Sequence, residues 1–270
     1  MLYIVATPIG NLNDMSLRAI DVLNSVDIVA CEDTRHTKIL LDKFNIKTKL
    51  IAYHKFNEKN SSEGILKLLK EGKTVALVSD AGMPLISDPG AVLVARLQQE
   101  NLDYTVIPGA NALLCALVLS GFDSSKFAFF GFLSEKNKER ASTIKQIAEF
   151  KGTSILYSSK HNINEDLAHL RTSLNDRNVC VVNEISKVFE KKLFFKLSSA
   201  VVENPAGEYV IVIDKPFDDD IAVKSIDINQ EIDTLVANGQ SINDACKQLA
   251  KEHNLPKRDV YNNYLKYRGN

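Results

Sequence analysis

Residues that could bind a polar ligand are concentrated in the stretch VALVSDAGMPLISDPGA, residues 75–91. The apolar run Val75–Val78 ends abruptly at Ser79-Asp80-Ala81-Gly82. The carboxyl end of a parallel strand is where open α/β sheets bind ligands, so this tetrad predicts a binding site. The Asp80 carboxylate suits a cationic or hydroxyl-bearing ligand, and Gly82 allows the backbone to approach it closely.

A similar tetrad, Ser87-Asp88-Pro89-Gly90, follows eight residues later. Asp88 can cap a helix, and Pro89 suits the first helical position. We therefore expect this second tetrad mainly to begin a helix that runs to about Gln99.

A third dense segment is EDTRHTK, residues 32–38. The Arg35 guanidinium could hold phosphate, and His36 or a carboxylate could move protons. The alternative is structural, because Asp33 or Thr34 can cap a helix while the charges remain solvated.

The loop ATPIGNL, residues 6–12, follows the first apolar strand. It lacks the glycine pattern of dinucleotide sites, and no P-loop lysine follows, so nucleotide phosphate binding is not indicated. The loop is either functional or a tight turn between a strand and a helix.

Several other chemistries are unsupported by the spacing of the reactive residues. The four cysteines are scattered, with no Cys-x-x-Cys pair, which argues against disulfides and a thiolate zinc site. The five histidines show no metal-ligand spacing, and no G-x-S-x-G elbow is present. The sequence therefore predicts no metal site.

The elements that must position these loops alternate between strand and helix. Unalternating apolar strands indicate a mainly parallel sheet covered on both faces. The expected strands are 2–6, 26–31, 49–53, 74–78 and 105–107, and the expected helices are one capped by Ser16 and those at 37–44, 61–69 and 89–99.

A second α/β unit follows Pro108-Gly109. It begins with an apolar helix at 110–119, closed by Gly121. Further strands are expected at 127–132, 154–157, 179–182 and 209–213, and further helices at 140–150 and 163–174. We place the domains at 1–112 and 113–217, with an acidic linker and a helical tail at 218–270.

The tail changes charge along its length. Residues 216–246 carry a local balance of −6 and residues 247–270 one of +4, although the whole chain has a formal charge of only −1. Three short helices are expected, and the last two have helix-turn-helix spacing. Tyr261, Tyr264 and Leu265 share an apolar stripe and should pack inward, whereas Tyr267 has more freedom.

The chain is not expected to enter a membrane. The longest mostly apolar run, residues 110–119, is far shorter than the roughly 20 residues of a membrane span. No basic segment precedes the first apolar residues, so the N-terminus does not resemble a signal peptide. These features predict a cytoplasmic protein.

Three segments together closely resemble one family: LYIVATPIGNLNDMSLRAI, EDTRHTKILL and VSDAGMPLISDPG. With PGANALLCALVLSGF and FFGFL, they are similar to the ribosomal small-subunit RNA methyltransferase I family of the tetrapyrrole methylase superfamily. The resemblance covers roughly residues 2–214. It implies two α/β domains that hold S-adenosylmethionine in the cleft between them, followed by a helical tail. The implied activity is 2′-O-methylation of a decoding-centre cytidine in 16S rRNA, and the implied assembly is a homodimer.

The resemblance also assigns residues to the cofactor. Its sulfonium and amino group are cationic and it has no phosphate, so a carboxylate and backbone carbonyls suit it better than a phosphate cradle. The implied contacts are Pro8, Val78, Ser79, Asp80, Gly82, Met83, Asn111, Ala112 and Ser158. The resemblance implies that the RNA is met within an assembled 30S subunit, and the candidates for RNA contact are Arg35, Lys38, Lys257 and Arg258.

Two other functions remain open. A tetrapyrrole methylase of the same superfamily is disfavoured by the EDTR segment and the basic tail. An RNA-binding protein with decayed catalysis is favoured only by departures from the family pattern at residues 158–162. The general base is not identified, and its candidates are Glu32, Asp33, Lys187 and Glu190.

Overall fold

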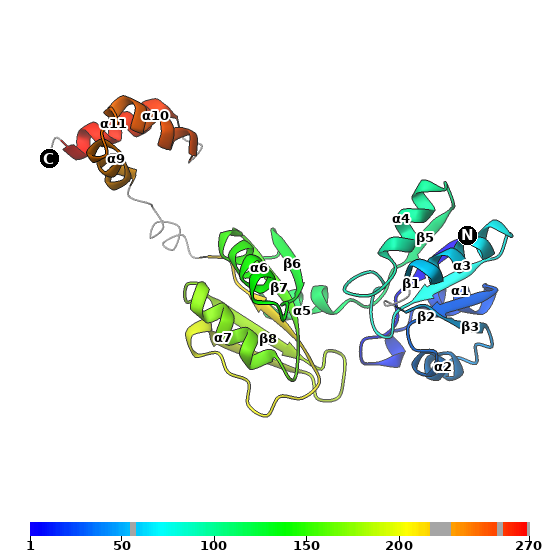
Figure 1. The fold of residues 1–270 in the computed structure, drawn as a ribbon. Coiled ribbons are helices and arrows are strands. Elements are labelled where there is room, and N and C mark those ends of the chain that lie inside the picture. Colours follow the sequence, from blue (N-terminus) through cyan, green and yellow to red (C-terminus); the bar gives the residue numbers. More distant parts are fainter. Residues whose placement is uncertain (55–57, 217–227, 253–255, 269–270) are drawn as a thin grey trace. The chain divides into compact units, whose positions relative to one another are not determined.

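The chain is seen in a computed structural model that describes residues 1–54, 58–216, 228–252 and 256–268. Two compact units are present, Met1–Lys215 and Pro216–Asn270 (Figure 1). The first unit contains two five-stranded sheets with their helices, and the described residues of the second unit form three helices. The predicted fold class is confirmed, whereas the boundary at residue 112 stays a prediction.

Five parallel strands form the first sheet, in the order β3-β2-β4-β1-β5. β4 lies between β1 and β2, so the loops that follow these three strands leave the same edge of the sheet next to one another. This is the edge at which α/β sheets bind ligands. The strands are β1 Leu2–Val5, β2 Ile28–Cys31, β3 Lys49–Ala52, β4 Val75–Val78 and β5 Tyr104–Ile107.

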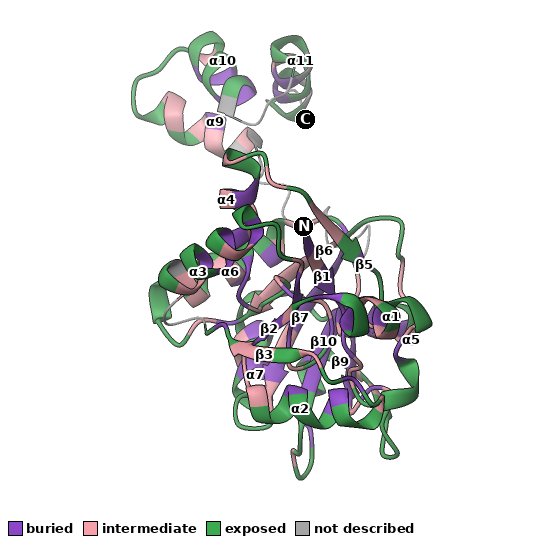
Figure 2. Cartoon of the chain, turned by 90° about the vertical axis from the view of Figure 1, so that its right-hand side faces the viewer, coloured by how far each residue is buried: buried purple, intermediate pink, exposed green. Residues whose placement is uncertain are grey.

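Alternate side chains of the first sheet face two different helical layers. In β4, Ala76 and Val78 join the core under α1 and α2, whereas Val75 and Leu77 join the core under α3 and α4. Burial on both faces explains why these strands are apolar without alternation; Figure 2 shows β1 and β2 with much buried colour and α2 with an exposed outer side. The helices are α1 Leu17–Ser25, α2 Thr34–Lys43, α3 Glu58–Lys70 and α4 Ala91–Gln99.

The start of α4 differs from the prediction. Asp88 does not cap it, Pro89 is not its first residue, and the helix begins at Ala91 after Gly90. The carboxylate of Glu58, at the start of α3, accepts hydrogen bonds from the Gly90 N–H at 2.8 Å and the Val92 N–H at 3.3 Å. The first turn is therefore satisfied from another helix, which leaves Asp88 available to the site.

The second sheet is mixed, in the order β6-β7-β10-β8-β9. Only β6 and β7 pair in parallel, and the other three pairings are antiparallel. The sequence did not lead us to expect β9, an edge strand in which exposed lysines flank the partly buried Leu193 and Phe195. The strands are β6 Phe127–Phe132, β7 Thr153–Ser159, β8 Asn178–Asn183, β9 Lys191–Lys196 and β10 Glu208–Ile213.

Helices also cover both faces of the second sheet. α5 (Ala112–Ser120) packs on one face and ends at Gly121, whose φ of 67° is the left-handed conformation of a C-cap. α6 (Asn137–Glu149) and α7 (Ile163–Ser173) pack on the other face. α5 thus belongs to the core of the second sheet, and its N-terminal turn comes directly after the loop that follows β5.

The tail consists of α9 (Ile228–Ala237), α10 (Ile242–Glu252) and α11 (Lys257–Arg268) around their own small core. Tyr264 is fully buried, and its hydroxyl donates to the Asp233 carboxylate at 2.6 Å. Leu265 is 48% exposed, so the prediction that it packs inward is wrong. The predicted acidic linker falls largely at 217–227, outside the described residues. None of the described helices combines the length and apolarity needed to cross a bilayer.

Candidate functional site

The loops after β1 and β4 are joined by backbone hydrogen bonds. The Thr7 N–H donates to the Gly82 carbonyl at 2.9 Å, and the Gly82 N–H donates to the Thr7 carbonyl at 3.0 Å. The Ser79 hydroxyl donates to the same Gly82 carbonyl at 3.0 Å, and the Thr7 hydroxyl donates to the Ser79 carbonyl at 3.1 Å. Gly82 has a φ of 83°, which strains any other residue. This network fixes the backbone on both sides of Asp80.

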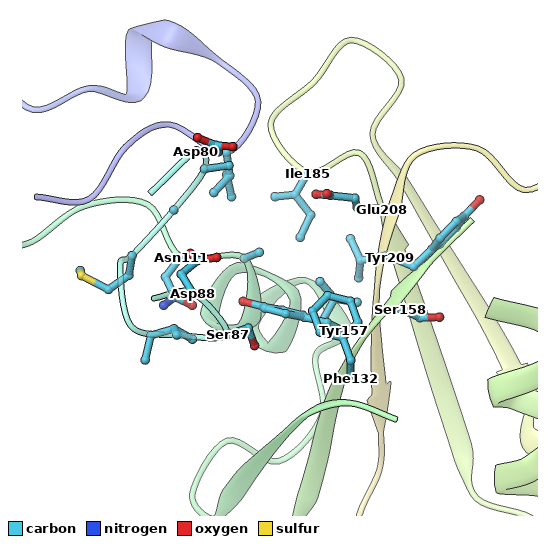
Figure 3. Close-up of a pocket in the computed structure, with 18 of the residues that line it drawn as sticks. Asp80, Ser87, Asp88, Asn111, Phe132, Tyr157, Ser158, Ile185, Glu208 and Tyr209 are labelled. Carbon is cyan, nitrogen blue, oxygen red and sulfur yellow. The ribbon is translucent and has the colours of Figure 1, made fainter. Parts of the chain in front are cut away.

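A cavity of about 300 Å³ lies against this network (Figure 3). Both α/β halves of the first unit contribute to it, through the loops after β2 and β4, the start of α5, and strands of the second sheet. Figure 3 shows Asp80, Asp88 and Asn111 on one side, with Tyr157, Ile185 and Glu208 across from them. A cavity of this size is at the lower end of the range for small-molecule and cofactor sites.

The lining of the cavity is strongly acidic. Among the described residues that line it, Lys187 supplies the one ammonium group, which pairs with Glu184 at 3.0 Å. The carboxylates in the lining are those of Glu32, Asp80, Asp88, Glu184 and Glu208. An excess of carboxylates in a partly enclosed site favours a cationic ligand and opposes a phosphate.

Asp88 carries the clearest electrostatic signature of this crowding. Burial, reinforced by the charges of Glu32 and Asp80, raises the pKa of Asp88 to about 6. The carboxyl is thus partly protonated in mildly acidic solution and ionised at neutral pH. A bound cation would favour the ionised form, so ligand binding and deprotonation of Asp88 should be coupled.

We expect Asp88→Asn to raise the free energy of unfolding at pH 7.5 by about 1 kcal/mol, a value discounted for solvent screening. Because the pKa of Asp88 is higher in the folded protein than in the unfolded chain, protonated Asp88 stabilises the fold. This stabilisation is complete below pH 3.8, the unfolded pKa, and is lost as the pH rises through about 6. The gain should therefore vanish at pH 4. Urea unfolding at the two pH values measures it, and the exposed Asp103→Asn controls for loss of one charge. An equal gain at both pH values would contradict the electrostatic cause.

The structure brings most of the predicted cofactor residues to this cavity. Of those residues, three do not line it: Val78 is buried at the end of β4, and Pro8 and Ser79 line a smaller neighbouring cavity of about 80 Å³. Asp80 lines both cavities. The residues that line the larger one are Asp80, Gly82, Met83, Asn111, Ala112 and Ser158.

Two of these residues also have structural duties. The Asn111 side chain accepts a hydrogen bond from the Leu114 N–H at 3.3 Å and so caps α5, which leaves its amide NH₂ to act as a donor. The buried Ser158 hydroxyl donates to the Asp166 carboxylate of α7 at 2.6 Å, and Figure 3 shows it directed away from the cavity. Ser158 can therefore meet a ligand there only through its backbone.

The four candidate bases are separated by the structure. Glu32 and Lys187 line the cavity. Asp33 caps α2 and holds the Arg35 guanidinium through both of its carboxylate oxygens, at 3.2 and 2.8 Å, and this pairing keeps the pKa of Asp33 well below its usual range. Glu190 accepts from the Ser186 backbone N–H at 2.8 Å. Asp33 and Glu190 are thus engaged in holding their own loops.

The predicted RNA-contact residues lie in two places. Arg35 is on the first turn of α2 with its side chain 90% exposed, and Lys38, one turn later, pairs with Asp42. The Asp33 backbone N–H donates to the Asp80 carboxylate at 3.2 Å, which ties the Arg35 turn to the cavity. Lys257 and Arg258 are exposed at the start of α11, in the second unit.

Apart from Ser158, sequence reasoning missed the part of the lining that comes from the second sheet. Phe132 and Tyr157 form an edge-to-face pair with centroids 5.5 Å apart, and Glu208 begins β10. Burial raises the pKa of Tyr157 to about 12, so its hydroxyl stays protonated at neutral pH. A lone acidic residue before the apolar run YVIVI was the available signal for Glu208.

A family model described as Tetrapyrrole (Corrin/Porphyrin) Methylases matches residues 1–201. Among solved structures, a diphthine synthase aligns with a TM-score of 0.63 at 13% identity, covering 79% of this chain and 89% of that one. Uroporphyrin-III-C-methyltransferase from Thermus thermophilus aligns with a TM-score of 0.59 at 16% identity, covering 79% and 94%. These structures share the fold.

Curated relatives define the chain more narrowly. Ribosomal RNA small subunit methyltransferase I of Halalkalibacterium halodurans is 39% identical, covering 97% of this chain and 94% of the relative. The protein of the same name from Synechocystis sp. is 41% identical, covering 97% and 96%. The chain therefore belongs to the ribosomal RNA small subunit methyltransferase I family, within the tetrapyrrole methylases. It is a methyltransferase, and its cofactor is S-adenosylmethionine.

Proposed function

We propose that this chain methylates the ribose 2′-hydroxyl of a decoding-centre cytidine in 16S rRNA, within an assembled 30S subunit in the cytoplasm. The observation that carries the proposal is the similarity to ribosomal RNA small subunit methyltransferase I along almost the whole chain. The cavity supports it, since five carboxylates and a backbone held open at Gly82 suit a cationic methyl donor.

The chain's own residues divide the work of the reaction. Bound S-adenosylmethionine supplies an electrophilic methyl group, whose transfer to oxygen releases a neutral thioether and one proton. Asp80 and Asp88 would hold the cationic donor by charge, and Glu32 is the lining carboxylate from the β2 loop that could take the hydroxyl proton. The Lys187 ammonium, paired with Glu184, suits stabilisation of a developing alkoxide better than proton abstraction.

Methyl transfer to isolated 30S subunits tests this function directly. With radiolabelled S-adenosylmethionine, label should enter 16S rRNA that lacks the modification. Alkaline hydrolysis should then leave the phosphodiester bond after one cytidine uncleaved, because cleavage needs a free 2′-hydroxyl and the methyl group blocks it. Label in a porphyrinoid acceptor would favour the tetrapyrrole alternative. RNA binding without transfer would favour an RNA-binding protein that has lost catalysis.

We also propose that the chain works as a homodimer. The outer side of α5 is apolar, with Leu114 48% exposed and Val118 79% exposed one turn apart. Exposed apolar side chains on one helix face are typical of protein–protein contacts. Analytical ultracentrifugation should give twice the chain mass of 30.0 kDa, and Val118→Lys should shift the equilibrium towards monomer.

The tail is proposed to strengthen RNA binding. It folds around its own core and forms a separate compact unit, so its removal should leave the first unit folded. A chain truncated after Asp214 should bind S-adenosylmethionine normally but RNA more weakly, with a shallower salt dependence, because phosphate contacts set that slope. The exposed basic residues concerned include Lys247, Lys251, Lys257 and Arg258. An unchanged slope, with the truncated protein now monomeric, would instead make the tail a dimerisation element.

A further inference from the structure

Two apolar side chains are unusually exposed at the tip of the loop between β8 and β9. Val188 is 92% exposed and Phe189 is 75% exposed. Leaving such side chains in water forgoes the stabilisation that their burial would provide. Neither side chain belongs to the buried core clusters of the first unit. Two adjacent exposed apolar side chains at a loop tip can serve as a contact surface.

The base of this loop is held tightly. The Ser186 hydroxyl is hydrogen-bonded to the Asp14 carboxylate of the first α/β half, and the Ser186 N–H donates to Glu190 at 2.8 Å. Glu184 and Ser186 adopt left-handed backbone conformations, with φ of 53° and 66°. These contacts fix the loop by residues on both sides of the tip, so Phe189 is presented from an ordered base.

The first half leaves room for the loop only because residue 10 is glycine. A Cβ built on Gly10 would lie 2.4 Å from the Ile185 carbonyl oxygen and 2.6 Å from the Lys187 Cγ. Both distances are shorter than van der Waals contact allows. The close approach of the ATPIGNL loop to the β8–β9 loop thus depends on Gly10, which gives that glycine a specific role.

The exposed tip adjoins the cofactor cavity and a set of lysines. Ile185 and Lys187 line the cavity, and Val188-Phe189 follows directly. Beyond the tip, Lys191 and Lys192 are exposed at the start of β9. An aromatic ring beside several cations is how proteins hold single-stranded nucleic acid, by stacking on bases and contacting phosphates.

We infer that Phe189 stacks on an unpaired RNA base beside the target nucleotide, while the flanking lysines contact the backbone. The inference rests on the proposed RNA substrate and adds a contact residue to it. RNA is favoured over a second copy of the chain because the tip is continuous with the cavity wall through Lys187, and the substrate must come to that wall. Lys191 and Lys192 also place two exposed ammonium groups on the β9 side of the tip, where they can meet a polyanion.

Tryptophan fluorescence can test this contact without catalysis. The chain has no tryptophan, so Phe189→Trp introduces a single tryptophan at the loop tip, which can be excited selectively over the tyrosines. Adding an RNA fragment that spans the decoding centre should quench this fluorescence. Phe127→Trp is the matched control, because Phe127 is 40% exposed at the opposite end of β6 from the cavity residue Phe132. Quenching that follows protein concentration instead of RNA would overturn the inference in favour of a second copy.

Steady-state kinetics on 30S subunits provide the second measurement. Phe189→Ala should raise the KM for the RNA substrate roughly tenfold, the loss expected for one base stack, with unchanged affinity for S-adenosylmethionine. Phe189→Trp should restore the KM, and Phe127→Ala should not change it. An unchanged KM for Phe189→Ala would refute the contact. If RNA quenches the Phe189→Trp protein but the wild-type protein transfers no methyl group, only the proposed reaction is refuted.

Discussion

Replacing Asp80 by alanine should weaken S-adenosylmethionine binding more than tenfold, which corresponds to about 1.4 kcal/mol or more. Asp80 follows the central strand β4, lines the cavity, and is held by the paired loops at Thr7 and Gly82. Removing its carboxylate takes away a charge partner for the cationic donor and leaves polar groups in the site without their acceptor. Isothermal titration calorimetry measures the change.

Matched variants separate the charge of Asp80 from its role in the loop. The Asp80 carboxylate also accepts from the Asp33 backbone N–H at 3.2 Å, so alanine removes a tie between two loops. Asp80→Asn keeps an acceptor and removes only the charge, so its loss of affinity reports the electrostatic share. Equal affinities for wild type and both variants would rule out Asp80 as a principal cofactor contact.

Local chemistry made much of the first half predictable. The Ser16 hydroxyl accepts from the Ala19 N–H at 3.1 Å, as its position before an apolar stripe predicts. β4 has no polar alternation because it is buried on both faces, and its carboxyl end therefore pointed to the site. Such features depend on residues close in sequence, so a pattern reveals them.

Features that depend on distant partners were not predictable in this way. The cap of α4 comes from Glu58, 32 residues before Gly90, and no pattern around Asp88 reveals it. The edge strand β9 is half exposed and rich in lysine. Its side chains alternate between exposed and partly buried, but the lysines leave it without the apolar run by which the other strands were predicted. Glu208 and Tyr157 reach the cavity only because the second sheet meets the loops of the first half, a relation that no local window contains.

The four candidate general bases could not be distinguished from the sequence for a related reason. Residue type alone made Asp33, Glu190, Glu32 and Lys187 equivalent as candidate bases. The structure distinguishes them by their partners, because Asp33 and Glu190 accept hydrogen bonds from their own loops whereas Glu32 and Lys187 line the cavity. Which group takes the proton is thus a question for Glu32→Gln and Lys187→Met compared in single-turnover experiments.

Replacing Arg35 by alanine should abolish RNA methylation while leaving cofactor affinity nearly unchanged. The guanidinium is 90% exposed, so phosphate can reach it, and its pairing with Asp33 holds the planar fork in place beside the cavity loop. The Asp33 side chain would still cap α2 by accepting from the backbone N–H of residue 35, at 2.8 Å in the native protein. The loop that supports Asp80 should therefore survive the change.

Two variants on the same helix make the Arg35 result specific. Arg35→Lys keeps the charge but loses the two-pronged donor, so it should recover only part of the activity. Lys43 lies eight residues after Arg35 on α2, which is about 12 Å along the helix axis. Lys43→Ala removes an exposed cation at this far end of the helix and should leave methylation unchanged. RNA binding across a salt series should show a shallower slope for Arg35→Ala than for Lys43→Ala, because only the first is expected to lose a phosphate contact. If Arg35→Ala instead loses S-adenosylmethionine affinity in calorimetry, the guanidinium supports the cofactor loop through Asp33, and the RNA contact must be sought elsewhere on the rim.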